Sequence, residues 1–339
     1  MFALESQHAT PRLRRSLLPR LLVLAVPLAL GACDGADSPL APAGADDALA
    51  PATESVAPAD ALAVLTAPRI AFMSYRYNDY PNLYLMDPLG KNVVRRTSWT
   101  GDAGAPAWSY DNKKIALSRA RLDAAKVRHE DIYLMNADGT NKRWARSLPS
   151  SFNITDPSWS PDGSRLVVAV NLGGTEYLAT LELATGNMAF VKENGTELVQ
   201  GSNPSYHPTG KSILYSGPDG KTVEEVYPDG DGYVLVSPGM PVGRPIYSPD
   251  GKKFAYSRVV SGSNMEIFVQ NRATYAAKRL TYSSAYDGEP SWSPDGMKIA
   301  FVSGRSGRHQ IWTMSSTTGG GLTRITQTTA GDVSPAFSH

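Results

Sequence analysis

A short phrase of residues recurs along the chain and constrains its fold more than any other feature. In its fullest form it reads Pro-Ser-Trp-Ser-Pro-Asp-Gly, at Pro290–Gly296. Full or looser copies begin at the prolines in positions 106, 157, 204, 245, 290 and 335, so the intervals are 51, 47, 41, 45 and 45 residues. Self-similarity at this period indicates an array of β-propeller blades, each built from four short strands.

Each repeat divides into four predicted strands. The recurring phrase forms the first, strand A, and an apolar run such as Lys298–Phe301 forms the second, strand B. Strand C is typified by Ile311–Met314 and strand D by Thr323–Thr326. The Pro-Asp-Gly and Asp-Gly sequences between them predict hairpin turns, because glycine adopts the positive φ that such turns require.

The two ends of the repeat array are complementary. The first repeat begins with strand B at Arg69 and lacks strand A, whereas Pro335–Ser338 is a strand A with no strand B after it. We therefore predict an all-β fold over residues 68–339: a six-bladed β-propeller of four-stranded blades, closed by the C-terminal strand completing the N-terminal blade. Such closure removes the unpaired strand edges that an open array would expose.

The repeat resembles a known family. Ser-Pro-Asp-Gly followed by Lys-Ile-Ala-Phe, with Ile132–Met135 and Arg279–Thr281 as further examples, is similar to the six-bladed propeller repeats of the TolB type over residues 68–339. TolB has a further α/β domain before its propeller, through which it engages partners, and residues 33–67 do not resemble it. Related propellers cap the hydrolase domains of prolyl oligopeptidases and dipeptidyl peptidases, but this sequence contains no Gly-x-Ser-x-Gly nucleophile elbow.

Residues 1–32 are typical of a signal peptide. Four arginines lie within positions 12–20 and an apolar run covers Leu21–Leu30, which is too short for an ordinary membrane-spanning helix. Leu30-Gly31-Ala32-Cys33 resembles a bacterial lipobox, in which the cysteine is acylated, and Cys33 is the only cysteine in the chain. We predict a lipoprotein that carries an N-terminal lipid on Cys33, exported to the periplasmic side of a bacterial membrane.

Three alternatives stay open at this end of the chain. The segment could be a plain signal peptide with an incidental cysteine. Arg14-Arg15 weakly resembles a twin-arginine export signal, so the general and twin-arginine routes are both possible. Asp34 resembles the residue that retains some lipoproteins in the inner membrane, but that rule varies between bacteria, so inner and outer membrane are unresolved.

Residues 33–67 are predicted to form a disordered tether. This segment is rich in Ala and Pro and almost free of aromatic residues, so it has too little apolar surface to fold. A flexible chain of this length has a root-mean-square reach of roughly 30 Å.

The charge balance disfavours nucleic acid as a partner. Loss of residues 1–32 removes four arginines and one glutamate, which leaves 29 basic and 31 acidic residues. Nucleic-acid binding requires a basic face. Nothing in the sequence implies an obligate homo-oligomer or a cofactor other than the lipid.

The loops between strands B and C are the first candidate site, because they vary in length and chemistry and binding residues concentrate on such loops. In a closed ring those of the sixth, first and second blades are neighbours. Tyrosine and arginine are favoured at interfaces. We predict a partner-binding face made of Arg76, Tyr77, Tyr80, Arg121, Arg128, His129, Arg305 and Arg308. The alternative is that these loops are simply solvated.

The mouth of the central channel is the second candidate, as a site for a ligand or a cation. The residues before the six prolines start the A strands, and the polar ones that we single out are Asp156, Asn203, Arg244 and Glu289. The aromatic residue that follows each proline by two positions, from Trp108 to Phe337, is expected to pack between blades instead.

No catalytic constellation or metal site is recognised, so we predict a protein that is not an enzyme. His129 and His309 are the histidines expected to approach each other across the first blade. Some lyases with TolB-like propellers use clustered histidines and a metal. The predicted function is a membrane-anchored protein–protein interaction module or accessory subunit of a membrane complex. The alternative is a ligand-binding, lyase-like or hydrolase-like propeller with its site at the channel mouth.

Overall fold

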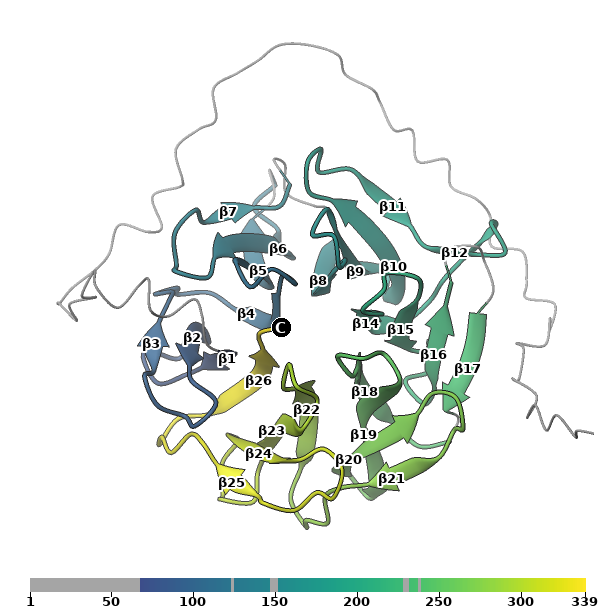
Figure 1. The fold of residues 1–339 in the computed structure, drawn as a ribbon. Coiled ribbons are helices and arrows are strands. Elements are labelled where there is room, and N and C mark those ends of the chain that lie inside the picture. The colour runs from purple at the N-terminus through teal and green to yellow at the C-terminus, as the bar shows by residue number, and fades with distance from the viewer. Residues whose placement is uncertain (1–67, 123–124, 147–151, 228–231, 237–238) are drawn as a thin grey trace, which may run out of the picture.

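The computed structural model describes residues 68–122, 125–146, 152–227, 232–236 and 239–339, and it is a closed ring of six four-stranded sheets (Figure 1). These residues form strands and no helix, and none of them forms a helix long and apolar enough to cross a membrane. The predicted fold class is confirmed. The predicted signal peptide, Cys33 and the tether lie outside the described residues.

Each blade is an antiparallel meander whose strands follow one another from the channel outward. Blade 1 contains β26 (Asp332–Phe337), β1 (Ile70–Ser74), β2 (Asn82–Met86) and β3 (Val94–Arg95). Blade 2 contains β4 (Ala103–Trp108), β5 (Lys114–Leu122), β6 (Arg128–Asn136) and β7 (Arg143–Trp144). Blade 3 contains β8 (Asn153–Trp159), β9 (Arg165–Leu172), β10 (Thr175–Glu182) and β11 (Met188–Phe190).

The second half of the ring repeats this order. Blade 4 contains β14 (Ser202–Tyr206), β15 (Ile213–Ser216), β16 (Val223–Val226) and β17 (Gly232–Val236). Blade 5 contains β18 (Val242–Tyr247), β19 (Lys253–Ser261), β20 (Asn264–Asn271) and β21 (Ala277–Arg279). Blade 6 contains β22 (Asp287–Trp292), β23 (Lys298–Ser303), β24 (Gln310–Ser315) and β25 (Thr323–Arg324).

The ring closes as predicted, because β26 pairs antiparallel with β1. Ile70 lies opposite Phe337 and Ser74 opposite Asp332. Beyond the strands, the Arg69 amide donates to Ser338 Oγ at 2.9 Å. The last strand of the chain is thus the inner strand of the first blade, and the C-terminus lies beside the channel (Figure 1).

The Ser-Pro-Asp-Gly sequence forms the turn between strands A and B. In blade 3, Ser160 Oγ donates to Asp162 Oδ1 at 2.6 Å, and the same carboxylate oxygen accepts from the Ser164 amide at 3.0 Å. Gly163 has φ of 69°, which glycine adopts without a Cβ clash. Ser160, Asp162 and Gly163 therefore each have a local role in the turn.

The aromatic residue of strand A connects neighbouring blades, as predicted. Trp159 Nε1 donates to the Ala107 carbonyl, and Trp108 Nε1 to the Ala336 carbonyl, both at 3.0 Å. All six aromatic residues at this position are buried: Trp108, Trp159, Tyr206, Tyr247, Trp292 and Phe337. Each apolar cluster of the core draws residues from two adjacent blades.

The threonine of the Arg-Leu-Thr motif follows strand D and attaches the loop between blades to strand C. Thr281 Oγ1 accepts from the Ile267 amide at 2.9 Å, and Thr326 Oγ1 accepts from the Ile311 amide at 2.9 Å. Strand D is therefore shorter than predicted: β21 ends at Arg279, and Thr281 belongs to the loop between blades.

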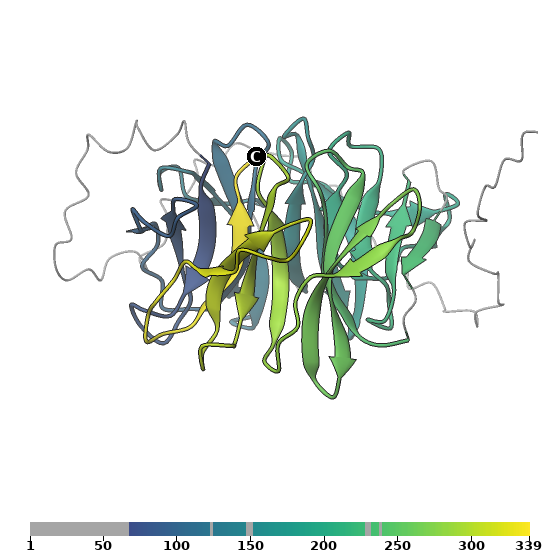
Figure 2. The same ribbon diagram turned by 60° about the horizontal axis from the view of Figure 1, so that its bottom comes forward.

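The ring has two distinct faces (Figure 2). The turns between strands A and B and between strands C and D lie on one, together with the C-terminus, and we call it the turn face. The loops between strands B and C and between successive blades lie on the other, which we call the loop face.

Two local features differ from the prediction. Arg121, Arg128 and His129, predicted to lie on a loop between strands B and C, lie in strands instead, because β5 and β6 continue pairing to Leu122 and Arg128. On this ladder the Arg121 guanidinium lies over the Trp144 ring, with Cζ 4.7 Å from the ring centroid. A small hairpin, β12 (Lys192–Glu193) and β13 (Glu197–Leu198), was also not predicted.

Candidate functional site

The β1–β2 loop presents three tyrosines to solvent on the loop face. Tyr75, Tyr77 and Tyr80 are 42%, 43% and 40% exposed. The loop is held in place by Asn78, whose Nδ2 donates to the Trp99 carbonyl at 2.8 Å. Exposed aromatic rings on a fixed loop form a surface that can bury apolar area on binding while their hydroxyl groups keep hydrogen-bonding capacity.

Arg76, in the same loop, turns inward. Its Nη2 lies 2.9 Å from Asp332 Oδ1, and its Nε donates to Ser74 Oγ at 2.9 Å. The guanidinium covers the rings of Phe72 and Tyr84, with Cζ 5.2 and 4.8 Å from their centroids. Because Asp332 is completely buried, Arg76 neutralises a buried charge and connects the β1–β2 loop to β26.

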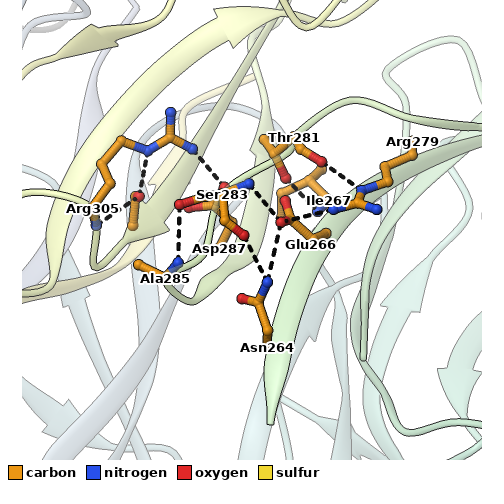
Figure 3. A network of polar contacts seen from close by, with 10 residues as sticks. Asn264, Glu266, Ile267, Arg279, Thr281, Ser283, Ala285, Asp287 and Arg305 are labelled. Atoms are coloured by element: carbon orange, nitrogen blue, oxygen red, sulfur yellow. Dashed lines mark hydrogen bonds and ion pairs between the residues drawn. The ribbon is translucent and has the colours of Figure 1, made fainter. Parts of the chain in front are cut away.

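Two other arginines of the predicted face are also engaged internally. Arg305 Nη2 lies 2.5 Å from Asp287 Oδ2 in blade 6 (Figure 3), with the same geometry as Arg76 and Asp332. Arg121 Nη1 lies 3.7 Å from Asp131 Oδ2. These side chains stabilise the blades, and little of their charge is presented to solvent.

The remaining predicted residues are more accessible. Arg128 is half-exposed and pairs with Asp102, and Arg308 is exposed. His129 is partly buried opposite Arg121 on the β5–β6 ladder, whereas His309 packs against Tyr286 with ring centroids 5.3 Å apart. No group of three His, Cys, Asp or Glu side chains that could hold a metal occurs among the described residues.

The six residues before the strand A prolines share one unusual backbone conformation. All have φ between 39° and 54°, in the left-handed region that non-glycine residues rarely adopt, and each lies at an irregularity of the A–B pairing. They are Ala105, Asp156, Asn203, Arg244, Glu289 and Ser334. The backbone shift is repeated in every blade, so it is part of how the strands turn at the channel.

These residues form a ring at one end of a cavity in the channel, and all of them except Ala105 are polar. Arg244 Nη1 lies 3.6 Å from Glu289 Oε2, and the amide and hydroxyl of Ser334 donate to the same oxygen at 2.8 Å. Below the ring, towards the turn face, is a cavity of about 280 Å³ lined by strand A prolines and aromatic residues. Asp156 and Asn203 also line it, so the four predicted channel residues do lie together.

Comparison with known proteins agrees with this architecture. The chain matches the TolB beta propeller domain over residues 64–240 and 233–339. It belongs to this family. The crystal structure of TolB from Acinetobacter baumannii is similar with a TM-score of 0.66 and 22% identity, covering 80% of this chain and 66% of that one. The structure of a putative TolB from Agrobacterium tumefaciens has a TM-score of 0.60 and 20% identity, covering 78% and 90%.

The chain is also similar to part of a curated protein. The uncharacterized peptidase YuxL of Bacillus subtilis is 29% identical over 153 residues, which are 45% of this chain and 21% of that protein. The chain thus spans about a fifth of that relative's length. At these levels of identity, the structural similarities show the fold alone.

Acidic side chains gather where the channel of this TolB-type propeller opens on the loop face. Burial raises the pKa of Glu130 and of Glu176, and the charge of Asp156 raises both further. Burial also raises the pKa of Asp156 itself, although Arg244 opposes this. Five carboxylates share this electrostatic environment with two arginines: Asp102, Glu130, Asp156, Glu176 and Glu289, with Arg128 and Arg244.

Sequence reasoning missed Glu130 and Glu176. They lie on strand C of blades 2 and 3, in no recurring phrase. No sequence signal brings them together with Asp156, because their proximity depends on how the strands of blade 3 are arranged and on how blades 2 and 3 pack against each other.

The stability of an Asp156→Asn variant should increase relative to that of the native chain as pH rises from 4 to 7. The pKa of Asp156 is raised by folding, so the folded state binds its proton more tightly, and stability is lost as pH rises from the unfolded value of about 3.9. Asn tolerates the left-handed backbone and stands at the equivalent position in blade 4 as Asn203.

The measurement is denaturant unfolding of both proteins at pH 4 and pH 7. The Asp162→Asn variant is the control, because its turn hydrogen bonds lower the pKa of Asp162 and the sign should reverse. A stability difference for Asp156→Asn that does not grow between pH 4 and pH 7 would contradict this assignment.

Proposed function

We propose that this TolB-type propeller is a protein-interaction module of the bacterial envelope, exported and anchored to a membrane by a lipid on Cys33. Residues 33–67 act as a tether that raises the local concentration of the propeller near membrane partners. The observation that carries the proposal is the exposure of Tyr75, Tyr77 and Tyr80 on one fixed loop of a rigid ring. Tyrosine is enriched among the residues that dominate binding energy.

The proposed binding face is centred on the tyrosine-rich loop of blade 1 and its neighbours in blades 2 and 6. Tyr77, Tyr80, Arg128 and Arg308 are its accessible members. Arg76, Arg121 and Arg305 support the face from below. They hold the loops and the strand ends, since their charges are directed at buried aspartates.

The acidic channel mouth beside this loop indicates the chemistry of the partner. The carboxylates of Asp102 and Glu289 act on Tyr75, whose pKa is raised by burial and then by these two charges. A partner segment that carries lysine or arginine would complement that charge, and its cations could also contact tyrosine faces. We therefore propose a basic segment of a membrane-associated protein as the bound element.

Replacing both Tyr77 and Tyr80 by Ala should weaken partner capture by at least about 100-fold. Removing a side chain that dominates an interface costs roughly 2 kcal/mol, or about 30-fold, for each residue. The assay is quantitative recovery of the crosslinked partner from membranes with the lipidated chain. Leu89→Ala and Met297→Ala, which are exposed elsewhere on the ring, are the matched controls and should capture normally.

Equal recovery of the partner by the tyrosine variant and by the controls would exclude the loop face as the partner-binding site. A Cys33→Ala chain tests the anchor separately. It should retain its affinity for the isolated partner and lose its recovery with membranes.

A further inference from the structure

The turn between strands A and B of blade 2 departs from the Ser-Pro-Asp-Gly phrase at two positions. It reads Ser109-Tyr110-Asp111-Asn112, so a tyrosine replaces the proline and an asparagine replaces the glycine. The serine and the aspartate are kept and bond to each other as in blade 3, with Ser109 Oγ donating to Asp111 Oδ1 at 2.6 Å. The turn itself is therefore preserved, and the two changed side chains are not needed to form it.

Both changed residues contact His339, which lies two residues beyond β26. The Tyr110 and His339 rings stack, with their centroids 4.0 Å apart and their planes 10° apart. The His339 amide donates to Asn112 Oδ1 at 2.7 Å, and Asn112 Nδ2 donates to the main-chain oxygen of His339 at 2.5 Å. The two departures from the repeat thus form a binding site for one residue.

The backbone and the core of blade 2 hold these two side chains in place. Asn112 has φ of 59°, in the left-handed region, which asparagine tolerates better than most residues. The other four turns have a glycine at this position: Gly163, Gly210, Gly251 and Gly296. The Tyr110 ring packs against the apolar cluster shared by blades 2 and 3, and burial raises the pKa of Tyr110 to about 12.

The Tyr110–His339 pair lies at the turn-face end of the channel cavity. Two positions after the aromatic residue of strand A, the A–B turns of blades 3 to 6 have a proline. Three of these prolines line the cavity together with Tyr110 and His339: Pro208, Pro249 and Pro294. A proline ring is compact, whereas a stacked phenol and imidazole are larger, so this pair narrows the entrance between blades 1 and 2.

His339 can leave its position without the unfolding of a blade. The pairing of β26 with β1 ends at Phe337. Ser338 is held separately, because it exchanges hydrogen bonds with the main chain of Arg69 in blade 1. His339 itself is exposed. Segments that are held by few contacts open locally at a small cost in free energy.

We propose that Tyr110, Asn112 and His339 form a latch that gates the turn-face entrance of the channel cavity. The stacked rings narrow the entrance while His339 is seated, and release of His339 widens it. The cavity of about 280 Å³ is lined by proline and aromatic side chains, so the molecules that the latch admits are small and largely apolar. The latch lies on the face opposite to the partner-binding face and does not depend on the function proposed there.

The test replaces both latch residues of blade 2 in the full chain. The double variant, Tyr110→Pro with Asn112→Gly, has the same turn phrase as blades 3, 5 and 6, so it should fold normally and unfold cooperatively near the native midpoint. Loss of two hydrogen bonds and a ring contact should increase the population of the open latch at least about tenfold.

The readout of gating is fluorescence quenching by acrylamide, a small neutral molecule. Three tryptophans line the cavity, Trp108, Trp159 and Trp292, and their quenching should increase in the double variant. Asn141→Gly is the matched control, because Asn141 has φ of 51° in the other turn of the same blade, and it should be quenched like the native chain. His339→Ala removes the ring and keeps the main-chain bonds to Asn112, so it should give a smaller increase.

Amide hydrogen exchange checks that the latch itself has opened. The His339 amide should exchange at least about tenfold faster in the double variant. The Ser338 amide donates to the Arg69 carbonyl at 2.8 Å in blade 1, so its exchange should not change. Equal quenching of the double variant and the native chain would overturn the proposal. Faster exchange at His339 without increased quenching would also overturn it, because the latch would then open without gating the cavity.

Discussion

A chain that ends at Gly331, without β26, will lose the cooperative fold of the propeller. Blade 1 would keep three strands, and the β1 edge would be left unpaired from Ile70 to Ser74. Phe337 would leave the core, and Trp108 would lose the carbonyl to which its indole donates. Burial of each large apolar side chain contributes about 1.5–3 kcal/mol, and total stabilities are about 5–15 kcal/mol, so the combined loss approaches the whole stability.

The measurement is thermal and denaturant unfolding followed by circular dichroism, with size-exclusion chromatography to detect association through the open edge. A synthetic peptide of residues 331–339 should restore cooperative unfolding by adding back the strand. A circular permutant is the control for chain connectivity. Residues 69 and 338 are hydrogen-bonded to each other, so a short linker can join these two ends of the propeller. The new termini are then placed between Gly173 and Gly174.

The permutant should remain folded, because it retains all of the strands. A shortened chain that unfolds cooperatively at the native midpoint would contradict the assigned role of β26.

Replacing Arg76 by Met should destabilise the propeller by roughly 3 kcal/mol, the lower end of what removal of one partner from a buried ion pair costs. Asp332 is completely buried, whereas the Arg76 side chain is 22% exposed. Met retains the apolar contacts with Phe72 and Tyr84, so the variant mainly removes the charge. The measurement is the free energy of unfolding from urea or guanidinium titrations.

Arg308→Met is the matched control, because Arg308 is exposed on the next blade, and it should change stability by less than about 0.5 kcal/mol. The double change Arg76→Met with Asp332→Asn should recover part of the loss, since it removes the uncompensated charge. Equal stability of the Arg76→Met and Arg308→Met variants would contradict the claim that Arg76 neutralises the buried charge of Asp332.

The fold could be predicted because its determinants are local and repeated. Ser160, Asp162 and Gly163 each have a role within a single turn, and the same phrase returns in other blades. Closure was also predictable, because an unpaired strand A at one end matches a missing strand A at the other. The β12–β13 hairpin escaped prediction because it occurs in one blade and belongs to no repeat.

The candidate site was predictable only in part, because its side chains are positioned by distant residues. Arg76 and Asp332 are separated by 256 positions, and the sequence does not reveal that the arginine turns inward. Tyr77 and Tyr80 were identified by residue type, and the structure adds that they are exposed. Tyr110 and Asn112 look like lost copies of the repeated proline and glycine until the closed ring brings His339 against them.

Site-specific photo-crosslinking on the lipidated chain in membranes would test the central claim, that the loop face captures a protein partner. A photoreactive amino acid is placed at Tyr77 or Tyr80 on the loop face, or at Met297 in a turn on the opposite face. The predicted result is one covalent adduct of the same mass from positions 77 and 80, and none from position 297. Adducts formed equally from all three positions, or only from position 297, would contradict the claim.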